Sequence, residues 1–344
     1  MLRRLTLLVS FSCASCAATA DGPTGETRSA VLGGRFAGAE DNATVLIEAK
    51  APRDGGNTAF CTGQIVAPRL VLTARHCLLT DRSPLRCNSD GTPFNVTSGG
   101  PRAPLESVTV YVGARRPPGL ETSPDFRAIK VEDVYTQEDF SVCRDDLAFL
   151  VLKEPALDVR TPFRRAAVRY DERVRFVGWG FTGDGQSELP ETRSAIEGIP
   201  ISELGPGTIP AGMFAIRGNT VCYGDSGGAA RVSGAIVGVY SRIEPAESCT
   251  SPLARNVFQG VSTQTSLIAR AFAAVGEVPT YVDDRPDAGT DAGTAGPPED
   301  SPPPSSSCHV GVGPRGGTRR APPGLLAAVA IIAVALGLRA SRRS

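Results

Sequence analysis

Three short segments carry side chains that together could perform nucleophilic catalysis. Residues 224–228 read Gly-Asp-Ser-Gly-Gly, residues 73–77 read Thr-Ala-Arg-His-Cys, and residues 146–150 read Asp-Leu-Ala-Phe-Leu. A serine hydroxyl becomes a good nucleophile when a base removes its proton, and histidine suits this role near neutral pH. A carboxylate that accepts the imidazole N–H holds the histidine in the tautomer that acts as a base. We therefore expect Ser226, His76 and an aspartate to form a catalytic group; the alternative is a glycine-rich turn with an incidental serine.

His76 is the one histidine outside the C-terminal tail. The other histidine of the chain, His309, lies in a stretch rich in proline, glycine and serine. His76 follows the apolar run Leu70–Leu72 and precedes Cys77, which could form a disulfide beside it. These neighbours favour a catalytic base over the alternative, a histidine on the surface of a loop.

The segments between these motifs predict an all-β protein. Apolar residues make up 41% of the chain and aromatic residues 6%, with 38 glycines and 28 prolines, which favours short strands joined by turns. Near the end, Ser262–Val275 has apolar residues at helical spacing and predicts a helix. Periodicity alone would also allow a β-sandwich. The short runs that predict strands are Thr44–Ile47, Gln64–Val66, Val108–Val112, Leu147–Leu152, Arg173–Val177 and Ala235–Tyr240.

The charge balance argues against several kinds of partner. Lysine and arginine together number 36, and so do aspartate and glutamate. Because there is no basic excess, we do not expect nucleic acid as a partner. No acidic cluster indicates a calcium site, and the expected chemistry needs neither a metal nor an organic cofactor.

Nine cysteines indicate an oxidising compartment. Cys13 and Cys16 lie near the N-terminus and Cys308 near the C-terminus, which leaves six in the middle of the chain. An even number suits three disulfides in an exported protein. A zinc site is disfavoured, because the middle part has no Cys-x-x-Cys pair and a single histidine. The six cysteines are Cys61, Cys77, Cys87, Cys143, Cys222 and Cys249.

The N-terminus has the features of an export signal. A basic start is followed by the apolar run Leu5–Phe11 and by the small-x-small sequence Ala18-Thr19-Ala20. The apolar run is too short to span a bilayer. We expect residues 1–20 to be a signal peptide; the alternative is lipid attachment at Cys16.

The C-terminus divides into three parts. Residues 277–323 are rich in proline, glycine, serine, aspartate and threonine, and bury too little apolar surface to offset their ordering entropy, so we expect a disordered linker. Residues 324–338 are apolar and would form a helix roughly 22 Å long. This helix is short against a hydrocarbon core of about 30 Å. A basic tail, 339–344, follows it.

The order of linker, Cys308, short apolar helix and terminal arginines resembles bacterial C-terminal sorting signals, especially the myxobacterial type. The resemblance implies a sorting enzyme that cuts near Cys308 and leaves the protein attached to the cell surface. The alternative is a plain membrane anchor. Either arrangement places the catalytic part outside the cytoplasm, on a flexible tether to the membrane or surface.

The three catalytic motifs, in the order His, Asp, Ser and separated by 70 and 80 residues, resemble the chymotrypsin/trypsin family of serine peptidases. Subtilisin-like enzymes and α/β-hydrolases have their triads in other orders. Gly178-Trp179-Gly180 and the cysteine pattern also match, and the resemblance covers about Val31–Gly276. It implies two antiparallel six-stranded β-barrels with the active site in the cleft between them, and a C-terminal helix.

The resemblance also assigns roles to individual residues. Asp145 and Asp146 both precede an apolar run, and strand alternation does not choose between them, but the family pattern selects Asp146. With His76 and Ser226 it forms the implied triad. The backbone N–H groups of Gly224 and Ser226 form the implied oxyanion hole.

Disulfides and activation follow from the same resemblance. It implies the bridges Cys61–Cys77 and Cys222–Cys249, and Cys87 and Cys143 remain to form the third. Residues 31–34, Val-Leu-Gly-Gly, resemble the family's mature N-terminus. Cleavage before Val31 would remove a propeptide, 21–30, and free an α-amino group to pair with Asp225. Because Ala30 precedes the cut and Arg28 lies two positions further back, the activating protease must accept alanine or trim after Arg28.

The implied specificity pocket differs from that of trypsin. Its base is Thr220, so no acid is present there to bind arginine or lysine. Ser241 matches a serine whose backbone pairs with the substrate, and Ile243 stands where the family has a glycine in the pocket wall. The other wall is Asn256. We expect small or medium uncharged side chains at the cleaved position, as in elastase.

The resulting hypothesis is a serine endopeptidase that acts on protein or peptide substrates through an acyl-enzyme. An inactive trypsin-like binding module is the alternative from another class, although such modules usually lose a member of the triad. An esterase would share the chemistry but not the sequence context.

Overall fold

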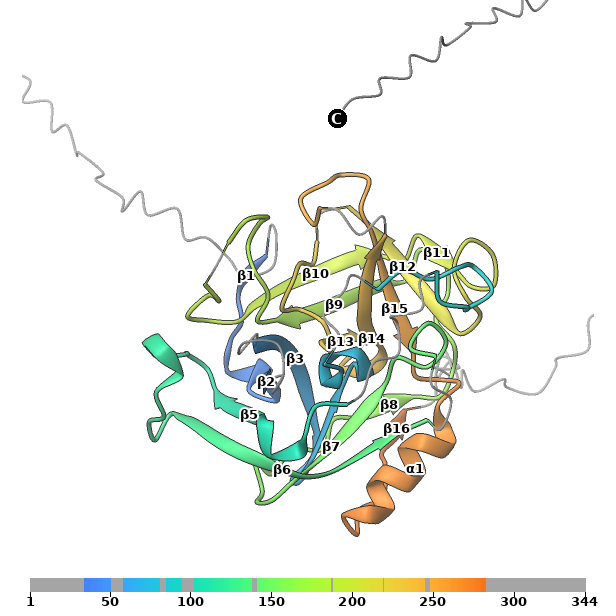
Figure 1. Cartoon of the computed structure of the whole chain (residues 1–344). Coiled ribbons are helices and arrows are strands. Elements are labelled where there is room, and N and C mark those ends of the chain that lie inside the picture. Colours follow the sequence, from blue (N-terminus) through green and yellow to red (C-terminus); the bar gives the residue numbers. More distant parts are fainter. Residues whose placement is uncertain are drawn as a thin grey trace, which may run out of the picture. The chain divides into compact units, whose positions relative to one another are not determined.

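The computed structural model describes residues 34–50, 58–80, 85–94, 102–137, 141–186, 188–218, 220–244 and 248–282. Within these ranges the chain forms sixteen β-strands and one α-helix (Figure 1). The predicted signal peptide, propeptide, apolar C-terminal helix and basic tail, together with Val31 and Cys308, lie outside the described residues. Four short 3-10 turns connect strands, at Ala39–Asp41, Arg75–Leu78, Leu105–Ser107 and Pro118–Leu120.

The first half of the domain is a closed antiparallel barrel, as predicted. Its strands pair in the order β2-β3-β4-β7-β6-β5. Apolar side chains of these strands fill the interior, and β4 and β7 are buried along their whole length. The strands are β2 (Thr44–Lys50), β3 (Thr58–Ala67), β4 (Leu70–Thr73), β5 (Val108–Gly113), β6 (Phe126–Thr136) and β7 (Ala148–Leu152).

The second half is a ten-stranded sheet instead of the expected closed six-stranded barrel. The main path runs β1-β10-β9-β13-β14-β15-β12-β11, and β8 and β16 join it through parallel pairs. The end strands β1 and β11 are two residues long, too short for a continuous closing ladder, and the described residues do not pair them with each other. The strands are β1 (Arg35–Phe36), β8 (Phe163–Arg164), β9 (Arg173–Gly178), β10 (Ser194–Pro200), β11 (Glu203–Leu204), β12 (Met213–Arg217), β13 (Ala229–Val232), β14 (Ala235–Glu244), β15 (Arg255–Gly260) and β16 (Tyr281–Val282).

The predicted helix near the end of the domain is confirmed as α1 (Thr265–Ala274). Its buried residues recur at helical spacing and pack on the core of the first barrel. The ring of Phe272 contacts those of Phe149 and Phe163 with centroids 6.4 and 5.9 Å apart. The buried positions of the helix are Leu267, Ile268, Ala271 and Phe272.

The fold continues beyond Gly276, where the peptidase domain was expected to end. Tyr281 in β16 pairs with Phe163 in β8, and the ring of Tyr281 lies under the guanidinium of Arg165, 3.9 Å from its carbon. These contacts hold the first six residues of the expected linker, 277–282, against the domain. Within the described ranges, no helix has both the length and the apolarity needed to cross a membrane.

Candidate active site

The pairing of β4 with β7 brings His76 and Asp146 together from 70 residues apart. Thr73, the last residue of β4, is paired with Ala148, the first residue of β7. The chain turns after Thr73 into the 3-10 turn that contains His76, and Asp146 comes two residues before Ala148. Both side chains therefore arise at the same end of adjacent strands.

His76 binds the carboxylate of Asp146 through two groups. The backbone N–H of His76 donates to Oδ1 at 2.8 Å, and Nδ1 of the ring lies 2.7 Å from Oδ2. The Asp146 side chain is fully buried, whereas that of His76 remains 23% exposed. Burial alone would raise the pKa of Asp146, but the charge of His76 and the hydrogen bonds from His76 and Ser241 outweigh it and lower that pKa. The carboxylate is thus held ionised next to an imidazole that solvent can reach.

Ser241 contacts this carboxylate directly, which the sequence did not indicate. Its hydroxyl donates to Asp146 Oδ2 at 2.6 Å, and the side chain is buried. The sequence assigned Ser241 only to backbone pairing with a substrate. Nothing in a sequence pattern reveals that a hydroxyl 95 residues away reaches this carboxylate.

Two buried glutamines also support the segment that contains Asp146. Gln259 accepts a hydrogen bond from the backbone N–H of Asp146 at 3.4 Å. Gln264, just before α1, donates to Asp145 at 2.9 Å and accepts from Gln137 at 2.7 Å. Asp145 is therefore bound to the residue just before the C-terminal helix, and Asp146 to His76, so the two neighbouring aspartates have different partners.

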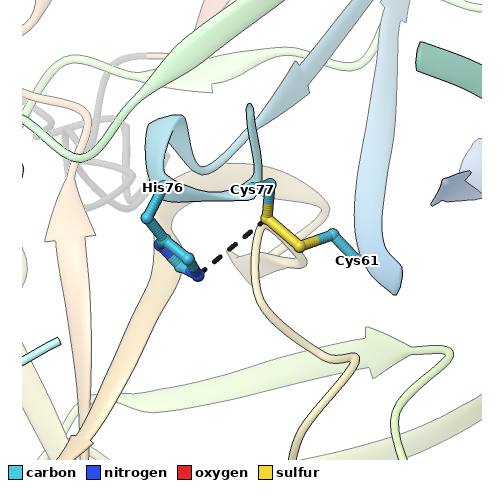
Figure 2. Close-up of side chains that lie close together, drawn as sticks. All are labelled: Cys61, His76 and Cys77. Atoms are coloured by element: carbon cyan, nitrogen blue, oxygen red, sulfur yellow. Dashed lines mark hydrogen bonds between the residues drawn. A yellow bond between two sulfur atoms is a disulfide. The ribbon is translucent and has the colours of Figure 1, made fainter. Parts of the chain in front are cut away.

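All three predicted disulfides are present: Cys61–Cys77, Cys87–Cys143 and Cys222–Cys249. The first one lies beside the imidazole, since Nε2 of His76 is 4.0 Å from Sγ of Cys77 (Figure 2). Cys61, His76 and Cys77 are close enough to suggest a metal site, but disulfide sulfurs are not the thiolates that zinc binds. The bridge therefore acts as a covalent support for the loop that contains His76.

The Gly-Asp-Ser-Gly-Gly segment needs glycine at two positions. Gly224 and Gly227 have φ values of +93° and +85°, a conformation that other residues rarely adopt. A Cβ atom on Gly227 would also collide with the backbone of Thr62 and Ala74. The tight turn leaves Ser226 partly exposed between buried neighbours.

Thr62 connects this turn to the first barrel, another role that the sequence did not reveal. Its backbone N–H donates to the carbonyl oxygen of Ser226 at 2.7 Å, and its hydroxyl donates to that of Gly224 at 2.9 Å. The same hydroxyl accepts from the N–H of Trp179 at 3.0 Å. The Ser226 carbonyl also lies 3.7 Å from Sγ of Cys77. The structure thus brings Ser226 next to the disulfide that adjoins His76.

The backbone N–H groups of the Gly-Asp-Ser-Gly-Gly turn differ in whether they donate a hydrogen bond. Those of Asp225, Gly227 and Gly228 donate to backbone carbonyls at 3.1, 2.9 and 2.9 Å. Those of Gly224 and Ser226 have no acceptor among the described residues. These two free donors are the ones that the sequence assigned to an oxyanion hole.

Asp225 is fully buried beside Gly178 and Gly180. Its Oδ1 accepts from the N–H of Gly180 at 2.8 Å and its Oδ2 from that of Cys222 at 2.9 Å. Burial raises the pKa of Asp225 to about 7, although these two hydrogen bonds oppose the shift. The carboxyl is therefore in surroundings where a nearby cation would strongly favour its ionised form. Val31, the predicted partner, lies outside the described residues.

The residues assigned to the specificity pocket lie together where the end of β14 pairs with the start of β15. Ile243 and Asn256 are direct cross-strand partners, so their side chains share one face of the sheet. Asn256 Nδ2 donates to Oγ1 of Thr220 at 3.0 Å. Ser241 lies two residues before Ile243 in the same strand, which connects this group to Asp146.

Comparison with known proteins agrees with this geometry. The family model described as "Trypsin" matches residues 45–268. "Trypsin Blo t 3" of Blomia tropicalis is 25% identical over 198 residues. The match covers 53% of this chain and 66% of that protein, just under two thirds of its length. "Trypsin" of Saccharopolyspora erythraea is 24% identical over 237 residues, 64% of this chain and 89% of that protein. Because the family model covers most of the chain, this protein belongs to the trypsin family of serine peptidases.

Proposed function

We propose that this chain is a serine endopeptidase that hydrolyses peptide bonds through an acyl-enzyme intermediate. The observation that carries the proposal is the double hydrogen bond from His76 to the buried, ionised Asp146, beside the turn that contains Ser226. Ser226 attacks the peptide carbonyl while His76 takes its proton, and His76 then protonates the leaving amine. Water, activated by the same imidazole, releases the acyl group.

Asp146 and the turn serve the charges that develop during this reaction. Asp146 accepts the Nδ1–H of His76, which keeps Nε2 free as the base and stabilises the imidazolium. The N–H groups of Gly224 and Ser226 stabilise the negative oxygen of the tetrahedral intermediate. Their lack of acceptors among the described residues supports this role.

Activation requires cleavage before Val31. The freed α-amino group pairs with Asp225, and the buried position and raised pKa of Asp225 support such a partner. Because Ala30 precedes the bond, the activating protease must accept alanine at this position. The alternative is cleavage after Arg28, followed by trimming of the residues that precede Val31.

The substrates are proteins or peptides with a small or medium uncharged side chain on the acyl side of the cleaved bond. Thr220 supplies no charge for arginine or lysine, and the buried Ile243 narrows the pocket. The enzyme works without a metal or organic cofactor.

The enzyme acts outside the cytoplasm. Three disulfides in the described residues support an oxidising compartment. From the sequence, residues 1–20 direct export, and the C-terminal segment tethers the domain, either as a membrane anchor or after processing near Cys308.

Labelling with a fluorophosphonate tests the proposal, because this probe reacts with activated serine nucleophiles. The exported chain should be labelled and should cleave a peptide library, whereas the Ser226→Ala variant should do neither. Asp145→Asn, at the neighbouring aspartate that binds Gln264, serves as a folded control. Absence of both labelling and cleavage in the activated wild-type chain would favour an inactive binding module.

A further inference from the structure

The amide oxygen of Asn256 is buried and receives no hydrogen bond from the described residues. It lies in the strand next to the one that contains Ser241, whose hydroxyl contacts Asp146. Asn256 in β15 is 0% exposed, and its Oδ1 atom has no partner within the part of the chain that the structure describes. Its Nδ2 group donates to the carbonyl oxygen of Gly218 at 2.7 Å and to Thr220 at 3.0 Å. A backbone carbonyl only accepts hydrogen bonds, so the contact with Gly218 determines which side of the amide is nitrogen. Oδ1 therefore points away from Gly218 and Thr220.

Apolar side chains flank this amide on both sides. Asn256 is paired directly with Ile216 in β12 and with Ile243 in β14, and both isoleucines are buried. An unpaired acceptor in such surroundings is costly, and native proteins retain few of them. A hydrogen bond made there with a ligand is correspondingly strong, because no solvent competes for the acceptor.

In the proposed function Asn256 belongs to the pocket for the acyl-side residue, and contacts of β14 connect this pocket to the catalytic groups. Ile243 follows Ser241 by two residues in β14. The Ser241 hydroxyl contacts Asp146, and the carbonyl oxygen of Tyr240, one residue earlier, accepts from Gly227 beside Ser226. The strand that contains Ile243, the cross-strand partner of Asn256, is thus hydrogen-bonded to the turn that contains Ser226.

Resting on the proposed peptidase function, we propose that Asn256 selects substrates whose acyl-side residue has an uncharged side chain with a hydrogen-bond donor. Serine, threonine, asparagine and glutamine meet this requirement. A carboxylate would place one acceptor against another, and an ammonium or guanidinium would bring a charge between two isoleucines with no acid at Thr220 to pair with it. An aliphatic side chain would leave Oδ1 unpaired.

The test compares fluorogenic peptides that differ only at the acyl-side residue, in nearly isosteric pairs. Threonine is paired with valine and asparagine with leucine. With the activated wild-type enzyme, kcat/KM should be about tenfold higher for the donor-bearing member of each pair, the usual size of one hydrogen bond. Equal values, or a preference for valine and leucine, would overturn the inference.

Two variants assign the preference to the amide. Asn256→Leu removes the acceptor at similar volume and should abolish or reverse the threonine preference. Ile243→Val changes the space nearby but keeps the acceptor, so the threonine-to-valine ratio should persist. If Asn256→Leu retains the wild-type ratio, the proposed role of Asn256 is wrong.

Fluorophosphonate labelling separates this inference from the proposed function, because the probe reacts with Ser226 without an acyl-side side chain. Labelling with no difference between paired peptides refutes the inference alone. A wild-type chain that is neither labelled nor active refutes both. If Asn256→Leu is not labelled because it fails to fold, the peptide pairs on the wild-type enzyme decide the question.

Discussion

Asp146 receives its two hydrogen bonds from His76 on different oxygens, one from the backbone and one from the ring, while Ser241 binds the ring-side oxygen. The backbone contact prevents the carboxylate from rotating, and the ring contact sets the tautomer of the imidazole. The carboxylate is thus a positioning group with three donors, of which the Ser241 hydroxyl can be removed without changing His76.

Replacing Asp146 by asparagine should lower kcat by about 10⁴. The amide presents an NH₂ group to one of the donors and favours the tautomer in which Nε2 carries the proton. Stopped-time or continuous assays of peptide hydrolysis measure this change in kcat.

Asp145→Asn is the matched control, because Asp145 binds Gln264 and not His76. It should retain kcat within a few-fold. A large loss in Asp145→Asn with little loss in Asp146→Asn would mean that the wrong aspartate has been assigned to the triad.

Ser241→Ala should make the protein more sensitive to acid. Asp146 has a lowered pKa, so its contribution to stability is present above about pH 4 and is lost as the pH falls through its folded pKa. Loss of the Ser241 hydrogen bond raises that pKa, so the contribution becomes smaller and disappears at a higher pH. Urea unfolding between pH 2.5 and 6 measures the free energy of unfolding. Ser241→Thr keeps the hydroxyl and should follow the wild type more closely; identical acid profiles for wild type and Ser241→Ala would contradict this account.

Thr62→Val should destabilise the protein and slow catalysis together. The change keeps the shape of the side chain but leaves the Gly224 carbonyl and the Trp179 N–H without their buried partner. The loss in the free energy of unfolding should be about 1–3 kcal/mol. A lower kcat should accompany it, since Gly224 belongs to the proposed oxyanion hole. Thr62→Ser retains the hydroxyl and should recover most of both losses, whereas equal behaviour of the two variants would argue for packing alone.

Before cleavage at Val31, Asp225 should reduce stability as the pH rises. Burial raises the folded pKa of Asp225 to about 7, compared with about 3.9 in an unfolded chain, so the folded state binds a proton more tightly between these values. The contribution of Asp225 to stability is therefore most favourable below about pH 4 and declines as the pH approaches 7, by up to a few kcal/mol.

The measurement compares uncleaved chains with and without Asp225→Asn, both in a Ser226→Ala background that prevents self-processing. Relative to Asp225→Asn, the parent chain should lose free energy of unfolding between pH 4.5 and 7.5. After cleavage, the α-amino group should remove most of this loss. Parallel pH profiles for the two uncleaved chains would show that Asp225 has no such penalty.

The sequence alone determined the features that depend on local pattern. Short apolar runs predicted six strands, and apolar residues at helical spacing predicted α1, because burial of one helix face requires that period. The glycines around Ser226 indicated a tight turn, and two of them do have positive φ. Cysteine number and family pattern predicted the three disulfides correctly.

Only the tertiary structure decided which distant groups meet. Strand register determines three sets of contacts: the Ser241 hydroxyl with Asp146, the Thr62 hydroxyl with Gly224, and Asn256 with its neighbours Ile216 and Ile243. A shift of one residue would turn each of these side chains to the opposite face of its sheet. The open second sheet and the addition of β16 likewise depend on long-range pairing. Local periodicity contains no information on register, which is why the chemistry of this site could be predicted from sequence but its supporting contacts could not.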